Sequence, residues 1–266
     1  MSARRSVFQR LPSVRVVVWA CVLAQIGIAG LLVSEETWSK QTFGGDRPIK
    51  SIETRDVTPG DQSRPFLHVG VPAHQDPRLR VNGPVSLPDD LPSRLEFTVE
   101  ETEADGRVLL IAGAIERGDA QRFAAYLESL EDPVDLVALH SPGGHVSEAI
   151  DIGRAIRAEG LNTLVGPDAA CVSSCPYMFA GGDARTASRA AWIGVHQHYY
   201  GENSLLPLFV AVQGVQAGQG ETMAHLNEMG VDPLLMVHAL KTPPEEIYFL
   251  VEDELVEYRL ATEIIP

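Results

Sequence analysis

The chain has 266 residues, which is long enough for one folded domain with appendages and too short for two average domains and a membrane segment. Its hydrophobic fraction of 45% and charged fraction of 21% are typical of globular proteins and exclude a fully disordered or fibrous chain. The formal net charge of −15 excludes a sequence-independent nucleic-acid binder, because contacts to phosphates need a basic face.

An apolar run, VVVWACVLAQIGIAGLLV, occupies residues 16–33 and follows four arginines, whereas the first acidic residue is Glu35. At about 1.5 Å per residue, a helix over this run spans about 27 Å, near the thickness of a hydrocarbon core. No small-x-small cleavage site follows it, so the pattern favours an uncleaved transmembrane signal anchor over a signal peptide. The arginines should stay in the cytoplasm, which places the folded domain across the membrane. In a bacterium we therefore expect a single-pass inner-membrane protein with its domain in the periplasm.

The three cysteines allow one intramolecular pair in the folded domain. Cys21 lies in the apolar run, which leaves Cys171 and Cys175. An oxidising periplasm favours pairing, although two cysteines within one regular helix would be poorly aimed at each other. The sequence leaves two alternatives open, a short local disulfide and two small buried thiols.

Residues 35–94 show no sustained hydrophobic period and contain many proline and glycine breakers, as in VTPGDQSRPF and NGPVSLPDDLPS. We expect an irregular stalk or linker there. The sequence thus predicts three parts: a cytoplasmic tip with the anchor at 1–34, the stalk at 35–94 and an α/β domain at 95–266.

Apolar strands alternate with amphipathic helices beyond residue 95. The expected strands are 106–115, 134–140, 161–166 and 191–198, and the expected helices include 118–132 and a segment from His145 to Gly160. Strands separated by helices of about a dozen residues favour a parallel sheet with right-handed crossovers. The part from Ser204 to the end is expected to be mostly helical.

Three loops carry the candidate chemistry, because functional groups in parallel α/β sheets gather where strands end and helices begin. They are HSPGGH after the second strand, ACVSSC after the third and HQHYY at the end of the fourth. In the first loop, Gly143 and Gly144 can aim backbone N–H groups at an anion, as half of an oxyanion hole, or can form a plain turn.

The second loop contains the candidate nucleophile. Proline is tolerated in the first turn of a helix, so Pro176 predicts a helix that starts near Ser173. The N–H of Ser174 could then stabilise negative charge, and a serine hydroxyl needs a base to become a useful nucleophile. His196 and His198, two residues apart on a strand, are the candidate bases or else ordinary polar residues. No metal site is expected from this histidine pair, because no third ligand stands at a supportive spacing.

The three motifs LHSPGGHVSEAIDIGRAI, AACVSSCPYMFAGG and IGVHQH, in this order and spacing, resemble the ClpP/crotonase superfamily. The likeness is to the Clp protease proteolytic subunit, more loosely to signal peptide peptidase A, and most closely to membrane-anchored bacterial ClpP-like proteins with a Cys-x-Ser-x-Cys motif. It covers about residues 105–262. The resemblance implies a fold of repeated β-β-α and βα units around a parallel sheet.

The resemblance also implies roles for single residues. Ser173 would be the nucleophile and His196 the general base, while the N–H groups of Gly144 and Ser174 would bind the oxyanion. Ile247 stands where the protease subunit has its catalytic aspartate, so Glu246 is carried as the third member in its place.

The expected function is that of a periplasmic serine hydrolase that acts on peptide or protein substrates, without a cofactor, as a homo-oligomer. The alternative is a non-catalytic scaffold in which the same loops hold a peptide or a partner. A crotonase-type acyl-CoA enzyme is disfavoured, because coenzyme A is cytoplasmic and the anchor directs the domain outward.

Overall fold

A computed structural model describes residues 15, 19, 22–26, 59, 62–65, 91–102, 106–198 and 208–266. The chain divides into two units, residues 1–50 and residues 51–266. Residues 22–26 of the predicted anchor are helical, and most of the rest of that run lies outside the described residues. In the described part of the chain, no helix combines the length and the apolar character that crossing a membrane requires. The anchor, and the boundaries at residues 34 and 94, stay predictions.

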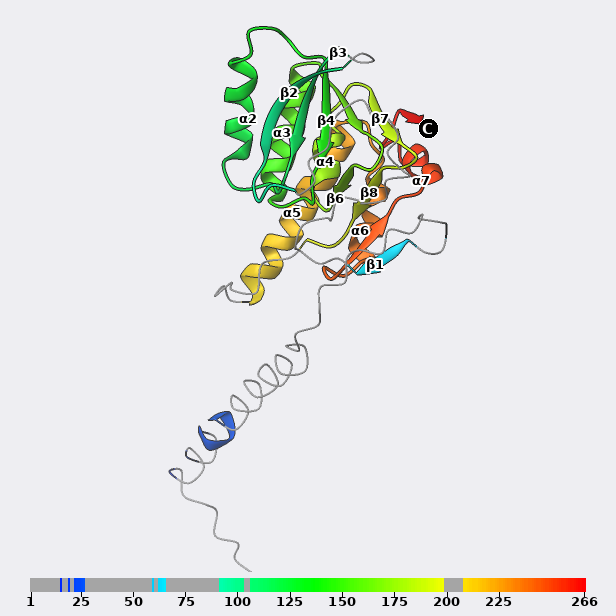
Figure 1. Cartoon of the computed structure of the whole chain (residues 1–266). Helices are drawn as coiled ribbons and strands as arrows, with labels where there is room; N and C mark the ends of the chain where they lie inside the picture. Colours follow the sequence, from blue (N-terminus) through cyan, green and yellow to red (C-terminus); the bar gives the residue numbers. More distant parts are fainter. Residues whose placement is uncertain are drawn as a thin grey trace, which may run out of the picture. The chain divides into compact units, whose positions relative to one another are not determined.

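A six-stranded sheet forms the larger part of the domain, in the order β10-β7-β5-β4-β3-β2 (Figure 1). Its neighbouring strands are parallel except for the antiparallel pair β2 and β3. The strands are β2 (Glu96–Thr102), β3 (Gly106–Ala112), β4 (Leu136–His140), β5 (Asn162–Val165), β7 (Arg185–Ser188) and β10 (Glu263–Ile265). The predicted α/β class with a parallel sheet is confirmed.

A four-stranded sheet, in the order β1-β9-β8-β6, carries two of the three candidate loops. Its strands are β1 (Ser63–Pro65), β6 (Ala170–Val172), β8 (Trp192–Val195) and β9 (Glu246–Phe249). β6 and β8 are parallel, while β9 runs antiparallel to both β8 and β1. Two features differ from expectation: β1 is a strand within the predicted irregular stalk, and β9 and β10 are strands within the part predicted to be mostly helical.

The helices are α2 (Asp119–Glu128), α3 (Val146–Ala158), α4 (Cys175–Phe179), α5 (Leu208–Glu228), α6 (Met236–Lys241) and α7 (Glu252–Glu257). α2 and α3 lie side by side next to β2, β3 and β4 (Figure 1). Alternate residues of β3 enter two apolar clusters: Leu109 and Ile111 pack in the main core, and Val108 and Leu110 in a smaller one. β3 is thus buried on both faces, which explains its continuous apolar sequence.

Two glycines bring α3 and α4 into close contact. A Cβ at Gly153 would lie 2.4 Å from the carbonyl oxygen of Tyr177, and a Cβ at Gly181 would lie 2.1 Å from the carbonyl oxygen of Gly153. Real Cβ atoms do not approach backbone oxygens so closely, so both positions require glycine. This contact fixes α4, and with it the loop that carries Ser173, against the core.

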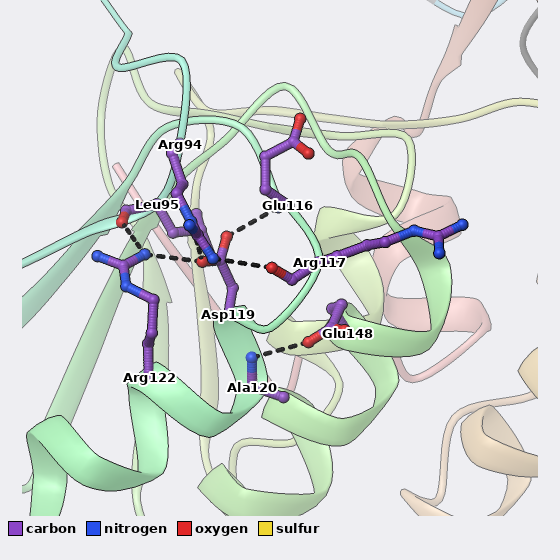
Figure 2. A network of polar contacts seen from close by, with 8 residues as sticks. All are labelled: Arg94, Leu95, Glu116, Arg117, Asp119, Ala120, Arg122 and Glu148. Atoms are coloured by element: carbon purple, nitrogen blue, oxygen red, sulfur yellow. Dashed lines mark hydrogen bonds and ion pairs between the residues drawn. The ribbon is translucent and has the colours of Figure 1, made fainter.

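A buried carboxylate fixes the loop between β3 and α2 (Figure 2). Asp119, fully buried, accepts hydrogen bonds from the Nε of Arg94 at 2.7 Å, from Arg122 at 2.7 Å and from the N–H of Glu116 at 2.8 Å. Arg94 also donates to the carbonyl oxygen of Arg117 at 2.8 Å. Burial by itself would raise the pKa of Asp119, but the hydrogen bonds from Glu116, Arg122 and Arg94 outweigh it and hold the pKa below its usual value.

Candidate active site

Ser173 lies immediately after β6 in a backbone conformation that is unusual for a residue with a side chain. Its φ is 63°, in the left-handed region, and its N–H donates to the carbonyl oxygen of Gly194 on β8 at 2.9 Å. Such conformations cluster at functional sites, where the surrounding structure holds them in place. α4 begins at Cys175 with Ser174 as its N-cap and with Pro176 in its first turn, so the expected helix starts two residues later than predicted.

His196 faces this serine from the end of the neighbouring strand. Val172 of β6 pairs with Gly194 of β8, so the residues that follow the two parallel strands emerge next to each other. The Nε2 of His196 lies 2.7 Å from the Oγ of Ser173, within hydrogen-bond distance. His196 is buried, whereas Ser173 is partly exposed. The two residues predicted to act together are therefore in contact.

His198 has a different neighbour from His196. Its Nε2 lies 3.2 Å from the hydroxyl oxygen of Tyr177 on α4, and burial lowers its pKa below the usual value. β8 ends at Val195, so the strand alternation that would place both histidines on one side does not extend to His198. Of the two candidate bases, the structure brings His196 to the serine.

A disulfide joins Cys171 on β6 to Cys175 at the start of α4, with their Cα atoms 5.1 Å apart. The structure thus has the short local disulfide and not two small buried thiols, the two alternatives that the sequence left open. The bridge does not lie within one helix, because the turn at 172–174 separates a strand residue from a helix residue. Both cysteines are fully buried. The bridge closes the turn that holds Ser173.

The glycine turn after β4 lies directly against this serine. Gly143 has a φ of 88°, and a Cβ there would lie 2.5 Å from the Cβ of Ser173 and 2.8 Å from the backbone nitrogen of Ser174. Gly144 has a φ of 147° and forms a bridge with Ile115, whose N–H donates to the carbonyl oxygen of Gly143 at 2.9 Å. Only glycine permits this approach at both positions.

The N–H groups of the glycine turn have acceptors that the sequence analysis missed. The N–H of Gly144 donates to the Oγ of Ser174 at 2.9 Å, and the N–H of Gly143 donates to the Oγ of Ser141 at 3.1 Å. The Oγ of Ser174 also donates to the carbonyl oxygen of Gly144 at 3.1 Å. The predicted oxyanion donor Gly144 is thus engaged by a side chain, whereas the N–H of Ser174 has no hydrogen-bond acceptor among the described residues.

The predicted third member, Glu246, gains no support from its position. Ile247 is fully buried and packs with Val172 and Phe249, on the face where a Cβ at Gly194 would lie 2.9 Å from its Cγ1. Adjacent residues of a strand point to opposite faces, so Glu246 points away from this cluster, and its side chain is exposed. An isoleucine occupies the buried position of this strand, next to the exposed Glu246.

His140 is a buried histidine that the sequence analysis did not single out. It ends β4, and its Nδ1 accepts a hydrogen bond from the N–H of Ala170 at 3.0 Å. Burial lowers the pKa of His140 to about 4, so the ring is neutral near pH 7. It ties the strand before the glycine turn to the strand before Ser173. In the described part of the chain, no group of three or more histidine, cysteine or acidic side chains is arranged to hold a metal ion.

Comparison with known proteins finds similarity among solved structures. No family model matches the chain, and no curated protein matches it. Among solved structures, a mutant of ClpP1 from Listeria monocytogenes is similar to this chain, with 16% sequence identity and a TM-score of 0.47. The match covers 59% of this chain and 90% of the ClpP1 chain.

Proposed function

We propose that the chain is a membrane-anchored periplasmic serine hydrolase of ClpP-like fold that cleaves peptide bonds. The observation that carries the proposal is the 2.7 Å contact between the Oγ of Ser173 and the Nε2 of His196. A nucleophile and a base within hydrogen-bond reach are the minimum that serine catalysis needs. The left-handed turn at Ser173, the disulfide around it and the glycine turn beside it support the same reading.

In this mechanism the Oγ of Ser173 attacks the carbonyl carbon of the scissile bond while His196 takes the hydroxyl proton on Nε2. The tetrahedral intermediate carries its negative charge on the former carbonyl oxygen, next to the N–H of Ser174. His196 then gives the proton to the leaving amine, the C–N bond breaks, and an acyl-serine remains. Water, deprotonated by His196, hydrolyses this ester and restores Ser173. Glu246 is not part of this proposal.

The anchor and the compartment belong to the proposal. They are supported by the apolar run at 16–33 with arginines on one side, and by the disulfide, which is typical of oxidising compartments. The proposed partners are the inner membrane, a peptide or protein substrate and further copies of the chain. In a bacterial host we expect the full chain to remain with membranes until detergent is added. Protease should digest its domain once the outer membrane is opened; a soluble chain, or a domain protected in spheroplasts, would contradict this arrangement.

A non-catalytic peptide-binding or scaffold protein is the second candidate, and two observations favour it. Serine hydroxyls engage both glycine N–H groups, and Ile247 occupies the position where a catalytic acid is expected. Under this reading the same loops would hold a peptide without cleaving it.

Labelling with a fluorophosphonate probe separates the two candidates, because this probe reacts with activated serines. The full chain in detergent would be compared with Ser173→Ala, His196→Ala and, as a matched control, Ser129→Ala, which changes an exposed serine at the C-terminal end of α2. Labelling that is lost in the first two variants and kept in the third supports the hydrolase. A folded wild-type chain that does not label would favour the binding protein.

A further inference from the structure

The side chain of Ser174 forms a link between the two loops of the site. Its Oγ accepts the hydrogen bond from the N–H of Gly144 and donates to the carbonyl oxygen of the same residue. Ser174 is 1% exposed, whereas Gly144 is exposed, so these bonds lie at the edge of the buried region. Among the described residues, its hydroxyl makes no hydrogen bond outside Gly144. The Ser174 hydroxyl thus accepts the hydrogen bond of the Gly144 N–H, the group that the resemblance to known proteases assigned to the oxyanion.

Ser141 makes a related contact with a different consequence. Its Oγ accepts from the N–H of Gly143 at 3.1 Å but also donates to the carbonyl oxygen of Gly113 at 2.7 Å. Ser141 is therefore tied to a second loop, and moving it would leave a buried carbonyl oxygen without its donor. Ser174 has no such second attachment. Turning its hydroxyl away would release both of its bonds together and leave the N–H of Gly144 free for another acceptor.

The two acceptors that compete for the N–H of Gly144 differ in strength. A serine hydroxyl is neutral, whereas the oxygen of a tetrahedral intermediate carries a full negative charge. Hydrogen bonds to charged acceptors are roughly twice as strong as those between neutral groups. The oxyanion should therefore displace the hydroxyl, while the neutral carbonyl of a bound substrate should not.

We propose that the Ser174 side chain is an internal plug, which holds the Gly144 N–H in the resting site and turns away only as the oxyanion forms. This inference rests on the proposed hydrolase function and concerns the regulation of that same site. The plug lowers the resting reactivity of Ser173, because the contact between Ser174 and Gly144 must break while the oxyanion forms. The backbone N–H of Ser174 remains in place as a donor throughout.

The test is the rate of labelling of Ser173 by a fluorophosphonate in the full chain, because the phosphoryl oxygen of the adduct needs the same donors as an oxyanion. Ser174→Ala removes the hydroxyl and keeps the backbone N–H, so we expect labelling about fivefold faster than in the wild type, which corresponds to about 1 kcal/mol. Ser174→Thr keeps a hydroxyl and should react at about the wild-type rate. Ser141→Ala is the matched control: it removes the hydroxyl that accepts from the N–H of the neighbouring Gly143, and it should not accelerate labelling.

The outcomes separate this inference from the function on which it rests. A wild type that labels together with a Ser174→Ala variant that labels no faster overturns the plug and leaves the hydrolase intact. Folded wild type and Ser174→Ala that both fail to label overturn both proposals. The structure of the phosphonylated wild type gives a second test that needs no variant. A phosphoryl oxygen on the Gly144 N–H, with Ser174 turned away, supports the plug; a Ser174 Oγ still on that N–H overturns it.

Discussion

The Oγ of Ser173 lies 2.7 Å from the Nε2 of His196, and this contact joins the ends of two neighbouring parallel strands. The pair therefore depends on the register of β6 and β8, in which Val172 faces Gly194, rather than on a flexible loop. General-base catalysis typically contributes about 10²- to 10⁴-fold to a rate. We expect His196→Ala to lower kcat by about that factor and His198→Ala, which changes a histidine that contacts Tyr177 instead, to lower it far less. Peptide hydrolysis measured for the three chains checks this, and an equal loss in both variants would contradict the assignment.

Gly143→Ala should abolish labelling of Ser173. The added Cβ would lie 2.5 Å from the Cβ of Ser173, and the φ of 88° disfavours any side chain. Gly106→Ala is the matched control, because Gly106 also has a positive φ, of 71°, but has no atom within 4 Å of the added Cβ. Gly106→Ala therefore has the backbone strain of a positive φ but no steric clash of the added Cβ. Similar labelling rates in the two variants would show that the glycine turn does not need its close approach to Ser173.

Removing the disulfide should lower both stability and reactivity. A bridge across a loop this short restricts the unfolded chain by about 2 kcal/mol in the loop-closure model. We expect the double variant Cys171→Ala and Cys175→Ala to lose about this much free energy of unfolding in denaturant titrations and to label more slowly, because the turn around Ser173 is no longer closed. A variant with wild-type labelling and reduced stability would limit the bridge to a structural role.

Asp119→Ala should destabilise the domain through the network in Figure 2. The change removes three hydrogen bonds to a buried carboxylate, but Arg94 and Arg122 are partly exposed and can be hydrated, so we expect a loss of about 2 kcal/mol in the free energy of unfolding. Asp132→Ala breaks the exposed pair with Arg107 and should cost less than about 1 kcal/mol. Equal losses in the two variants would contradict the special role of the buried carboxylate.

Acid should weaken the fold through His140. Its pKa falls from 6.5 to about 4 in the folded chain, so the unfolded chain binds a proton more readily. The stabilising contribution is complete above pH 6.5 and is lost as the pH falls through about 4, by about 3 kcal/mol in total. His140→Asn keeps an acceptor for the N–H of Ala170 but does not titrate, so its unfolding free energy should fall less between pH 7 and pH 4. An equal fall in unfolding free energy for the wild type and His140→Asn would show that His140 is not the source of the acid sensitivity.

The sequence predicted the elements whose pattern is strong and missed those whose pattern is weak. The apolar residues of β3 and β4 and the amphipathic face of α3 correctly predicted an α/β domain with a parallel sheet. β7 has the sequence RTAS and β10 the sequence EII, which are too short to show a period of two. β1 lies among prolines and glycines, and its strand pairs with the edge of β9, which its own sequence does not reveal.

The candidate site was likewise predicted only in part. The loop motifs predicted that Ser173 and His196 lie together, and the two side chains are in contact. The strand before Ser173 is β6 and not the predicted strand 161–166, because the three residues of β6 are too few to show a pattern of their own. The occupation of the Gly144 N–H could not be predicted, because it depends on the rotamer of Ser174 and not on its place in the sequence. The position of Ile247 was read from the motif, but the outward direction of Glu246 required the register of β9.

Because the disulfide is buried, its oxidation state depends on the compartment in which each molecule folds. Neither Cys171 nor Cys175 has accessible surface in the folded chain, so oxidants and reductants cannot reach the sulfurs while the fold stays closed. The oxidation state is therefore set while the chain is folding. A molecule that folds in a reducing cytoplasm keeps two enclosed thiols, and one that folds in an oxidising space keeps the bridge. The redox state of this cysteine pair therefore shows in which compartment a molecule folded. Mass spectrometry can distinguish the two forms, because the dithiol is heavier than the disulfide by two hydrogen atoms.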